Sequence, residues 1–241
     1  ALYSNTTGTQ HTAVGYQAGY SQTTAGSDNA YLGYVAGYSN LTGTQNTAVG
    51  SRALQNNTNS YNTAVGYQAG YSTTTGGITA VGYTALAANT TGVDNTAVGL
   101  SAGGTITTGN RNTAVGRGVL NSTTTSSDNT GLGYGTLNQN TGNSNTAVGS
   151  SALQLNTTAS QNTAVGYQAG YSNTTGGSNT LIGFQAGYTN TYPYNTFIGF
   201  QAGYTSNSSG NTGAPGNVCV GVQAGYSLTT GYGNNFFGNS A

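Results

Sequence analysis

The chain lacks most of the residue types on which binding and catalysis usually depend. It has no Lys, Glu, Met or Trp, and charged residues make up 2% of its 241 residues. An ordinary domain is about a quarter charged. Because the formal net charge is also zero, the sequence offers neither a basic stripe for nucleic acid nor an acidic face for cations. We therefore expect no nucleic-acid partner.

Cysteine and long apolar runs are also scarce. The single Cys219 excludes an intramolecular disulfide. No apolar run approaches the ~18 residues of a membrane-spanning helix, and no signal peptide is visible at the N-terminus. We expect no membrane insertion. Since the sequence has no initiating Met, we expect it to be a processed or truncated product.

What the chain has instead is one phrase repeated along its whole length, as in NTAVGYQAGYSTTTG from Asn62. Each copy contains a Gly that follows an aliphatic or aromatic residue. These glycines are Gly15, Gly33, Gly50, Gly66, Gly82, Gly99, Gly116, Gly133, Gly149, Gly166, Gly183, Gly199, Gly221 and Gly238. The steps between them are 16 to 18 residues, apart from one step of 22. Such regularity argues against the disorder that the polar, Gly-rich composition alone would indicate.

Certain positions around the repeated Gly keep their residue type. Asn lies three places before the apolar residue in twelve of fourteen copies, with His11 and Ile78 as exceptions. Ala lies three places after the Gly in twelve of fourteen, with Val119 and Thr136 as exceptions. The Thr-rich segment between copies varies in length. This pattern predicts a short strand ending at the Gly, followed by a variable turn.

A repeat of about 17 residues cannot bury a core alone, but stacked repeats can. Two strand-like segments and two turns fit in this length. We therefore predict an all-β chain, a parallel β-solenoid or β-roll of about 14 coils, as a single domain over residues 1–241. Equivalent positions would lie about 4.8 Å apart along the axis.

Stacking of the coils would place like side chains in columns. The conserved Asn would form a ladder of buried amides that satisfy one another without charge. The ladder residues are Asn46, Asn62, Asn95, Asn112, Asn129, Asn145, Asn162 and Asn179. Asp94, Arg111 and Asp128, each one residue before the Asn position, would form a charge ladder, with Arg111 between two carboxylates.

Two further expectations concern packing. After the conserved Ala, most copies read Gly-Tyr and others read Leu followed by a smaller or polar residue, so we expect Tyr71 and Leu54, for example, to fill the same space. Along the strand, Thr63 and Val65 share one face while Ala64 points to the other. Both faces carry small or apolar groups, and the chain has little core of its own. We therefore expect further copies of the chain to pack around a common axis.

The NTAVG cores, followed by YQAGYS or ALYSNTTG, resemble two families of fibrous proteins. They look like the head repeats of trimeric autotransporter adhesins of the YadA type, and more closely like the repeats of phage tail-fibre proteins. The resemblance covers essentially the whole chain. It implies a left-handed parallel β-roll assembled as a parallel homotrimer. The coil departs from the adhesin pattern in length, about 17 residues rather than 14.

No residue pattern indicates catalysis, a metal or a cofactor. His11 has no second His, Glu or Cys placed to help it and replaces Asn in the ladder. Cys219 takes the place of a small residue, which favours a buried apolar role. The sequons at Asn5 and Asn173 arise from the repeat, so they give little indication of glycosylation.

Two features are candidate contact sites. Exposed aromatic rows bind sugars by stacking, which makes Tyr16, Tyr67 and Tyr167, each directly after a repeated Gly, candidates for contact with a cell-surface glycan or receptor. The second is a loop insertion at about residues 206–216, where the step lengthens to 22. Its candidate contact residues are Ser206, Asn207 and Pro215.

We predict a non-enzymatic structural shaft of a fibre or adhesin, located outside the cell or on a virion surface, that gives reach and surface attachment. Its main partner would be other copies of itself. One alternative is the subunit of a free filament stacked end to end, since Ala1 and Ala241 both occupy the Ala position. An ice-binding solenoid is another, although the Thr-rich turns vary in length. A glycan-degrading tailspike would need paired carboxylates, and three Asp in one repeated position make a poor set.

Overall fold

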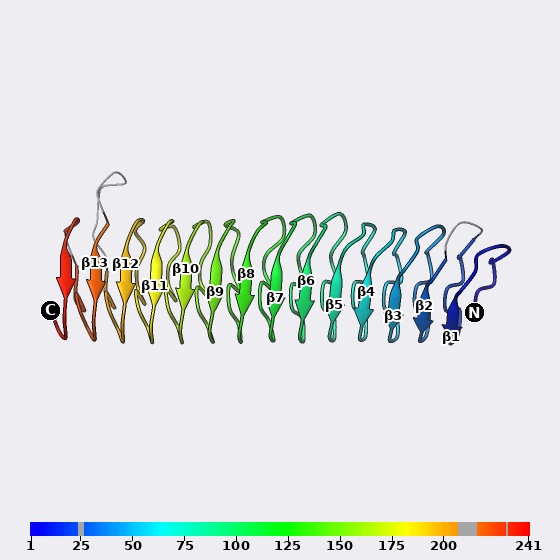
Figure 1. Cartoon of the computed structure of the whole chain (residues 1–241), viewed down its shortest axis with the longest axis horizontal. Coiled ribbons are helices and arrows are strands. Elements are labelled where there is room, and N and C mark those ends of the chain that lie inside the picture. The colour runs from blue at the N-terminus through cyan, green and yellow to red at the C-terminus, as the bar shows by residue number, and fades with distance from the viewer. Residues whose placement is uncertain (24–26, 207–215, 230) are drawn as a thin grey trace. The chain divides into compact units, whose positions relative to one another are not determined.

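The computed structural model describes residues 1–23, 27–206, 216–229 and 231–241. These residues form no helix, and their strands are all parallel (Figure 1). The prediction of an all-β parallel solenoid with repeats of about 17 residues is confirmed. The chain divides into two compact units, residues 1–125 and 126–241. The single domain predicted over residues 1–241 stays a prediction.

Each unit holds seven strands of three residues, and neighbouring strands pair in sequence order without a crossover. The first unit contains β1 (Thr12–Val14), β2 (Ala30–Leu32), β3 (Thr47–Val49), β4 (Thr63–Val65), β5 (Thr79–Val81), β6 (Thr96–Val98) and β7 (Thr113–Val115). The second contains β8 (Thr130–Leu132), β9 (Thr146–Val148), β10 (Thr163–Val165), β11 (Thr180–Ile182), β12 (Thr196–Ile198), β13 (Val218–Val220) and β14 (Asn235–Phe237). Within each unit, equivalent residues of successive coils are direct partners, as Ala64 and Ala80 are.

The conserved Gly ends each strand because its backbone leaves the extended region. Gly99 has φ +134°, a value that favours glycine, and a Cβ at this position would lie 2.6 Å from the carbonyl oxygen of Gly116 in the next coil. Two backbones approach closely here. The repeated Gly therefore sets both the end of the strand and the spacing between coils.

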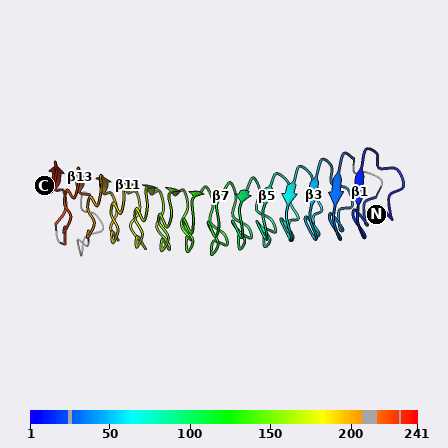
Figure 2. The ribbon, with the colours of Figure 1, turned by 90° about the horizontal axis from the view of Figure 1, so that it is seen from below.

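The return half of the coil is not a strand. The two strand-like segments predicted per coil reduce to one, because residues after the Gly alternate into positive φ, as Gln68 (+53°) and Gly70 (+58°) do. Backbone hydrogen bonds still join coil to coil here, with Gly70 N donating to Ala85 O at 2.9 Å and Ser72 N donating to Ala87 O at 3.1 Å. Figure 2 shows, for unit 2, β11 and β13 along one edge of the coils, with the turns extending away from it.

The core lies between the middle residue of each strand and the return half. Most middle residues are fully buried Ala, such as Ala64 and Ala164. Bulk comes from buried leucines on the return half, such as Leu54 and Leu153, or from a large middle residue such as Tyr31. The hydroxyl of Tyr31 donates to Gln22 Oε1 at 3.1 Å and accepts from Asn40 Nδ2 at 2.6 Å, so this buried phenol is satisfied.

Bulky groups and glycines complement each other across the core. Tyr31, Leu181 and Phe197 are the large middle residues, and each of their coils has Gly on the return half. A Cβ on Gly187 would lie 2.7 Å from Leu181 Cδ2 and 3.1 Å from Phe197 Cδ2. Each glycine therefore makes room for bulk in its own or a neighbouring coil.

The expectation that Tyr and Leu fill the same space is wrong. Leu54 and Leu153 are fully buried, whereas Tyr71 and Tyr171, one position further along the chain, are only half-buried and lie on the outside. Adjacent residues point in different directions, and the leucines have positive φ that turns their side chains inward (Leu54, +48°). The tyrosines therefore form a surface feature and add no bulk to the core.

Candidate interaction surface

The outward side of the strands carries two regular columns, which we call the strand face. It consists of the first and third residues of each strand. The first position is Thr in eleven of fourteen strands, and the third is Val, Leu, Ile or Phe in all of them. The middle residue Ala164 is fully buried, whereas Val165 is 36% exposed. The strand is therefore covered on one side only, by its own chain.

A second exposed row adjoins the strand face just beyond the conserved Gly. We call it the aromatic row: Tyr16, Tyr34, Tyr67, Tyr83 and Leu100 in unit 1, and Tyr134, Tyr167, Phe184, Phe200 and Val222 in unit 2. These residues are exposed although large and apolar. Since only the Gly separates them from the third strand residue, the strand face and the aromatic row form one continuous apolar band in each unit.

The aromatic row holds the three predicted contact tyrosines, and all three are exposed. Their rings stack on neighbouring rungs: Tyr16 on Tyr34, Tyr67 on Tyr83, and Tyr167 on Phe184, with centroids 5.3 to 5.4 Å apart. A stacked ring presents its edge to solvent, because its neighbour covers its face. Sugar stacking on ring faces, the basis of the prediction, is therefore blocked wherever the row is continuous.

The Asn positions form hydrogen-bonded columns inside each unit. All eight predicted ladder residues are buried, at 0 to 1% exposure. Along unit 2, Asn145 N donates to Asn129 Oδ1, Asn162 N to Asn145 Oδ1 and Asn179 N to Asn162 Oδ1, each at 3.0 Å. The Nδ2 atoms donate to the same oxygens at 3.1 to 3.3 Å. Each side-chain oxygen thus receives both a backbone and a side-chain donor of the next coil.

A second buried polar column was missed by the sequence reasoning. It lies seven residues after the conserved Gly and includes Asn40, Asn57, Asn89, Asn140, Asn156, Asn173 and Asn190. It bonds to the first column, as in the 3.1 Å hydrogen bond that Asn145 Nδ2 donates to Asn140 Oδ1. The signal was present as a recurring Asn in the Thr-rich segment. The varying length of that segment hid it.

The charged residues occupy a turn position one residue before the Asn column. Asp94, Arg111 and Asp128 have φ of +57°, +53° and +62°. Asp tolerates this left-handed conformation better than most residues, which explains its recurrence here without reference to charge. Asp94 and Arg111 hold equivalent positions of neighbouring coils in unit 1, since β6 pairs with β7 in register. Asp128 holds the same position before β8 in unit 2. The charge ladder stays a prediction.

The loop predicted as a contact site lies largely outside the described residues, which include neither Asn207 nor Pro215. Ser206 is described and fully buried. Its prediction as a surface contact is wrong, because this Ser belongs to the second polar column rather than to the insertion. Asn173 is also fully buried. Its sequon is therefore closed to modification in the folded chain.

Cys219 and His11 show no sign of chemistry. Cys219 is fully buried, and burial raises the pKa of its thiol to about 11, so it stays protonated near neutral pH. Among the described residues, neither ring nitrogen of His11 finds a hydrogen-bond partner. Within the same part of the chain, His, Cys and Asp side chains form no group of three that could hold a metal ion.

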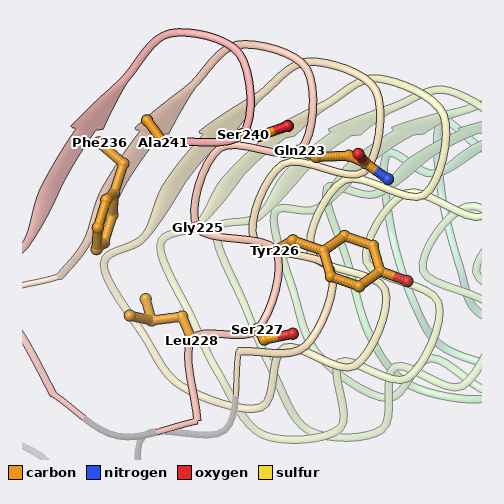
Figure 3. Close-up of a pocket in the computed structure, with 8 residues that line it drawn as sticks. All are labelled: Gln223, Gly225, Tyr226, Ser227, Leu228, Phe236, Ser240 and Ala241. Atoms are coloured by element: carbon orange, nitrogen blue, oxygen red, sulfur yellow. The ribbon is translucent and has the colours of Figure 1, made fainter.

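One hollow of about 400 Å³ lies at the end of unit 2, over the last coil (Figure 3). It is lined by Gln223, Gly225, Tyr226, Ser227, Leu228, Phe236, Ser240 and Ala241. Leu228 and Phe236 occupy core positions, so the hollow is the end of the core rather than a separate pocket. Tyr226 is the one titratable side chain of the lining, and the hollow therefore has no acid and base pair for catalysis.

No family model, curated protein or solved structure matches the chain. The resemblance to tail-fibre and adhesin repeats therefore stays a prediction. None of the described residues forms a helix long and apolar enough to span a bilayer. The fold and the apolar band are the observations on which a functional proposal can rest.

Proposed function

We propose that the chain is the structural shaft of an extracellular or virion-surface fibre or adhesin, without enzymatic activity. Copies associate side by side through the strand face and the aromatic row, as a parallel homotrimer. The shaft provides reach and holds attachment sites away from its base.

The single observation that carries this proposal is the continuous apolar band. Val165, Ile182 and Ile198 of successive coils expose 36 to 37% of their surface, and Tyr167, Phe184 and Phe200 beside them expose 42 to 47%. Monomeric soluble proteins rarely expose a contiguous apolar patch of more than a few hundred Å². A regular band of this kind on an uncharged chain is best covered by an identical band, and a closed ring of copies covers all of them.

The internal bonding of each unit supports a mechanical role. Neighbouring strands pair in register, and the Asn columns tie each coil to the next through buried hydrogen bonds. In a solenoid, contacts run only between neighbouring coils, so adding coils adds length without enlarging the core. Reach is therefore obtained with very little apolar sequence.

A charge placed in the band tests the proposal. We expect the wild-type chain to sediment as a trimer and Ile182→Glu to sediment as a monomer at the same concentration. Burying three carboxylates together should raise the dissociation constant by about 100-fold or more. Thr158→Glu, an exposed turn residue away from the strands, is the control and should leave the trimer intact. A monomeric wild type, or a trimeric Ile182→Glu variant, would contradict the proposal. Species that grow with concentration beyond a trimer would favour the end-to-end filament.

A second candidate, ice binding, is favoured by one observation. The Thr-rich turns do vary in length, but the strands carry Thr in register, for example Thr146, Thr163 and Thr180. With Val or Ile two residues further on, these Thr form a flat, uncharged array of evenly spaced hydroxyl and methyl groups. The irregularity of the turns therefore does not count against ice binding by the strand face.

Thermal hysteresis separates the two candidates, since both use the strand face and cannot operate together. The shaft proposal predicts a trimer without thermal hysteresis. Ice binding predicts a monomer that depresses the freezing point, and Thr163→Lys should abolish most of that depression. Hysteresis in the wild type that the Lys variant loses would replace the shaft proposal.

A further inference from the structure

A second exposed strip runs along unit 2 beyond the aromatic row, built from Gln side chains. Four coils repeat the order aromatic or aliphatic, Gln, Ala, Gly, Tyr. Gln185 Nε2 donates to Gln168 Oε1 at 2.8 Å, Gln201 Nε2 to Gln185 Oε1 at 3.0 Å, and Gln223 Nε2 to Gln201 Oε1 at 3.1 Å. The amides therefore point the same way and form a continuous polar ladder on the surface.

A row of tyrosines accompanies this ladder. Tyr171, Tyr188, Tyr204 and Tyr226 stack with centroids 5.0 to 5.1 Å apart and ring planes within 5° of parallel. Within one coil, Tyr226 N donates to Gln223 O at 3.2 Å, which closes a four-residue turn. The ends of such a turn lie less than about 7 Å apart. Figure 3 shows the Gln223 and Tyr226 side chains on the same side of the coil, both directed away from the core.

The strip has hydrogen-bonding capacity left over. An amide has two N–H donors and an oxygen with two lone pairs. In the described residues, the side chains of Gln185 and Gln201 make only the ladder bonds, so each keeps one N–H and one lone pair. The hydroxyls of the four tyrosines have no protein partner there either. Burial, with smaller contributions from Tyr171 and Tyr204, raises the pKa of Tyr188, so the row stays uncharged.

We propose that this strip binds a neutral, extended β-linked hexose chain lying along the solenoid axis. One rung supplies an amide and a phenol hydroxyl every 5.0 to 5.1 Å. That repeat is close to the advance per sugar of an extended β-linked chain, so each sugar meets one rung. An extended peptide repeats every two residues, at about 6.6 Å, and falls out of step. A nucleic acid or acidic polysaccharide would find no cation among the Gln and Tyr residues of the strip.

Contact on this strip would be through ring edges and hydroxyls, since the faces of the stacked tyrosines are covered. This distinguishes it from the face stacking predicted from the sequence for Tyr16, Tyr67 and Tyr167. The inference deepens the attachment role in the proposed function and rests on it. It requires only the four coils that carry the Gln ladder.

Titration of the full chain with cellohexaose tests the inference, with maltohexaose as the α-linked probe of different shape. We expect cellohexaose to bind and maltohexaose not to. Replacing both Gln185 and Gln201 by Leu removes two amides while keeping side-chain size, and should weaken cellohexaose binding about tenfold. The variant should keep the wild-type melting temperature within a few degrees, which circular dichroism checks.

Gln68→Leu is the matched control. Gln68 lies in an identical YQAGY segment of unit 1, but its neighbours in the adjacent coils are Arg52 and Thr84, so it belongs to no ladder. Its binding should be unchanged. The inference is overturned if the wild type does not bind cellohexaose, if the double variant binds equally well, or if Gln68→Leu loses as much. Sedimentation of the same samples reports the trimer separately, so failure of the strip is distinguishable from failure of the shaft.

Discussion

Gly99→Ala lowers the unfolding free energy by about 3 to 5 kcal/mol, the largest effect that we expect from a substitution that deletes no interaction. The φ of +134° is unfavourable for any side chain, and the new Cβ would lie 2.6 Å from Gly116 O and 2.7 Å from Gly116 C. Backbone atoms cannot move aside without separating two coils. Urea denaturation followed by far-UV circular dichroism measures the loss as a lower midpoint.

Gly238→Ala separates the two causes. Its φ is similar, +125°, but a Cβ there meets no heavy atom of the described residues within 4 Å. Only the conformational penalty applies, and we expect a loss of about 1 kcal/mol. Equal losses at the two positions would show that coil spacing does not depend on the Gly, and that its role is purely conformational.

Asn145→Ala is expected to lower the unfolding free energy by about 3 to 5 kcal/mol, since it removes the centre of a buried column. Asn145 Oδ1 is the acceptor for Asn162 N at 3.0 Å and for Asn162 Nδ2 at 3.1 Å. The substitution takes this acceptor away from both buried donors, at about 1 to 3 kcal/mol for each. Native-state hydrogen exchange should show faster exchange of the Asn162 amide than of the amides several coils away.

Asn56→Ala is the control for this loss. Asn56 is half-buried, and its side chain makes no hydrogen bond to the described residues. Its substitution should change stability by less than about 0.5 kcal/mol. If Asn56→Ala and Asn145→Ala were equally stable, the column of amides would contribute nothing beyond the strand-paired backbone.

The sequence predicted those features of the fold that depend on a constant spacing. Asn145 and Asn162 lie 17 residues apart and keep the same neighbours, so stacking alone places one over the other. The end of each strand also followed from the repeated Gly. Such positions are specified by the backbone, which is the same in every coil.

Features that depend on side-chain direction could not be predicted in the same way. Leu153 and Tyr171 lie in neighbouring coils, one inside and one outside, because the intervening residues have positive φ in a pattern that no alternation rule describes. The second polar column, with Asn156, was hidden by segments of changing length. Alternation showed that Thr63 and Val65 share a face, but it does not say whether that face is covered, so the exposed Thr column did not follow from it.

The complementarity between glycines and bulky core residues limits how such a chain can change. Phe197 reaches Gly187 and Gly203, so its coil tolerates only neighbours that leave room. Exchanging a single repeat for a Leu-bearing one would overfill the core there, and the reverse exchange at Leu54 would leave a void. Duplication or recombination should therefore preserve pairs of adjacent repeats, and the heritable building block is longer than the phrase that the eye picks out.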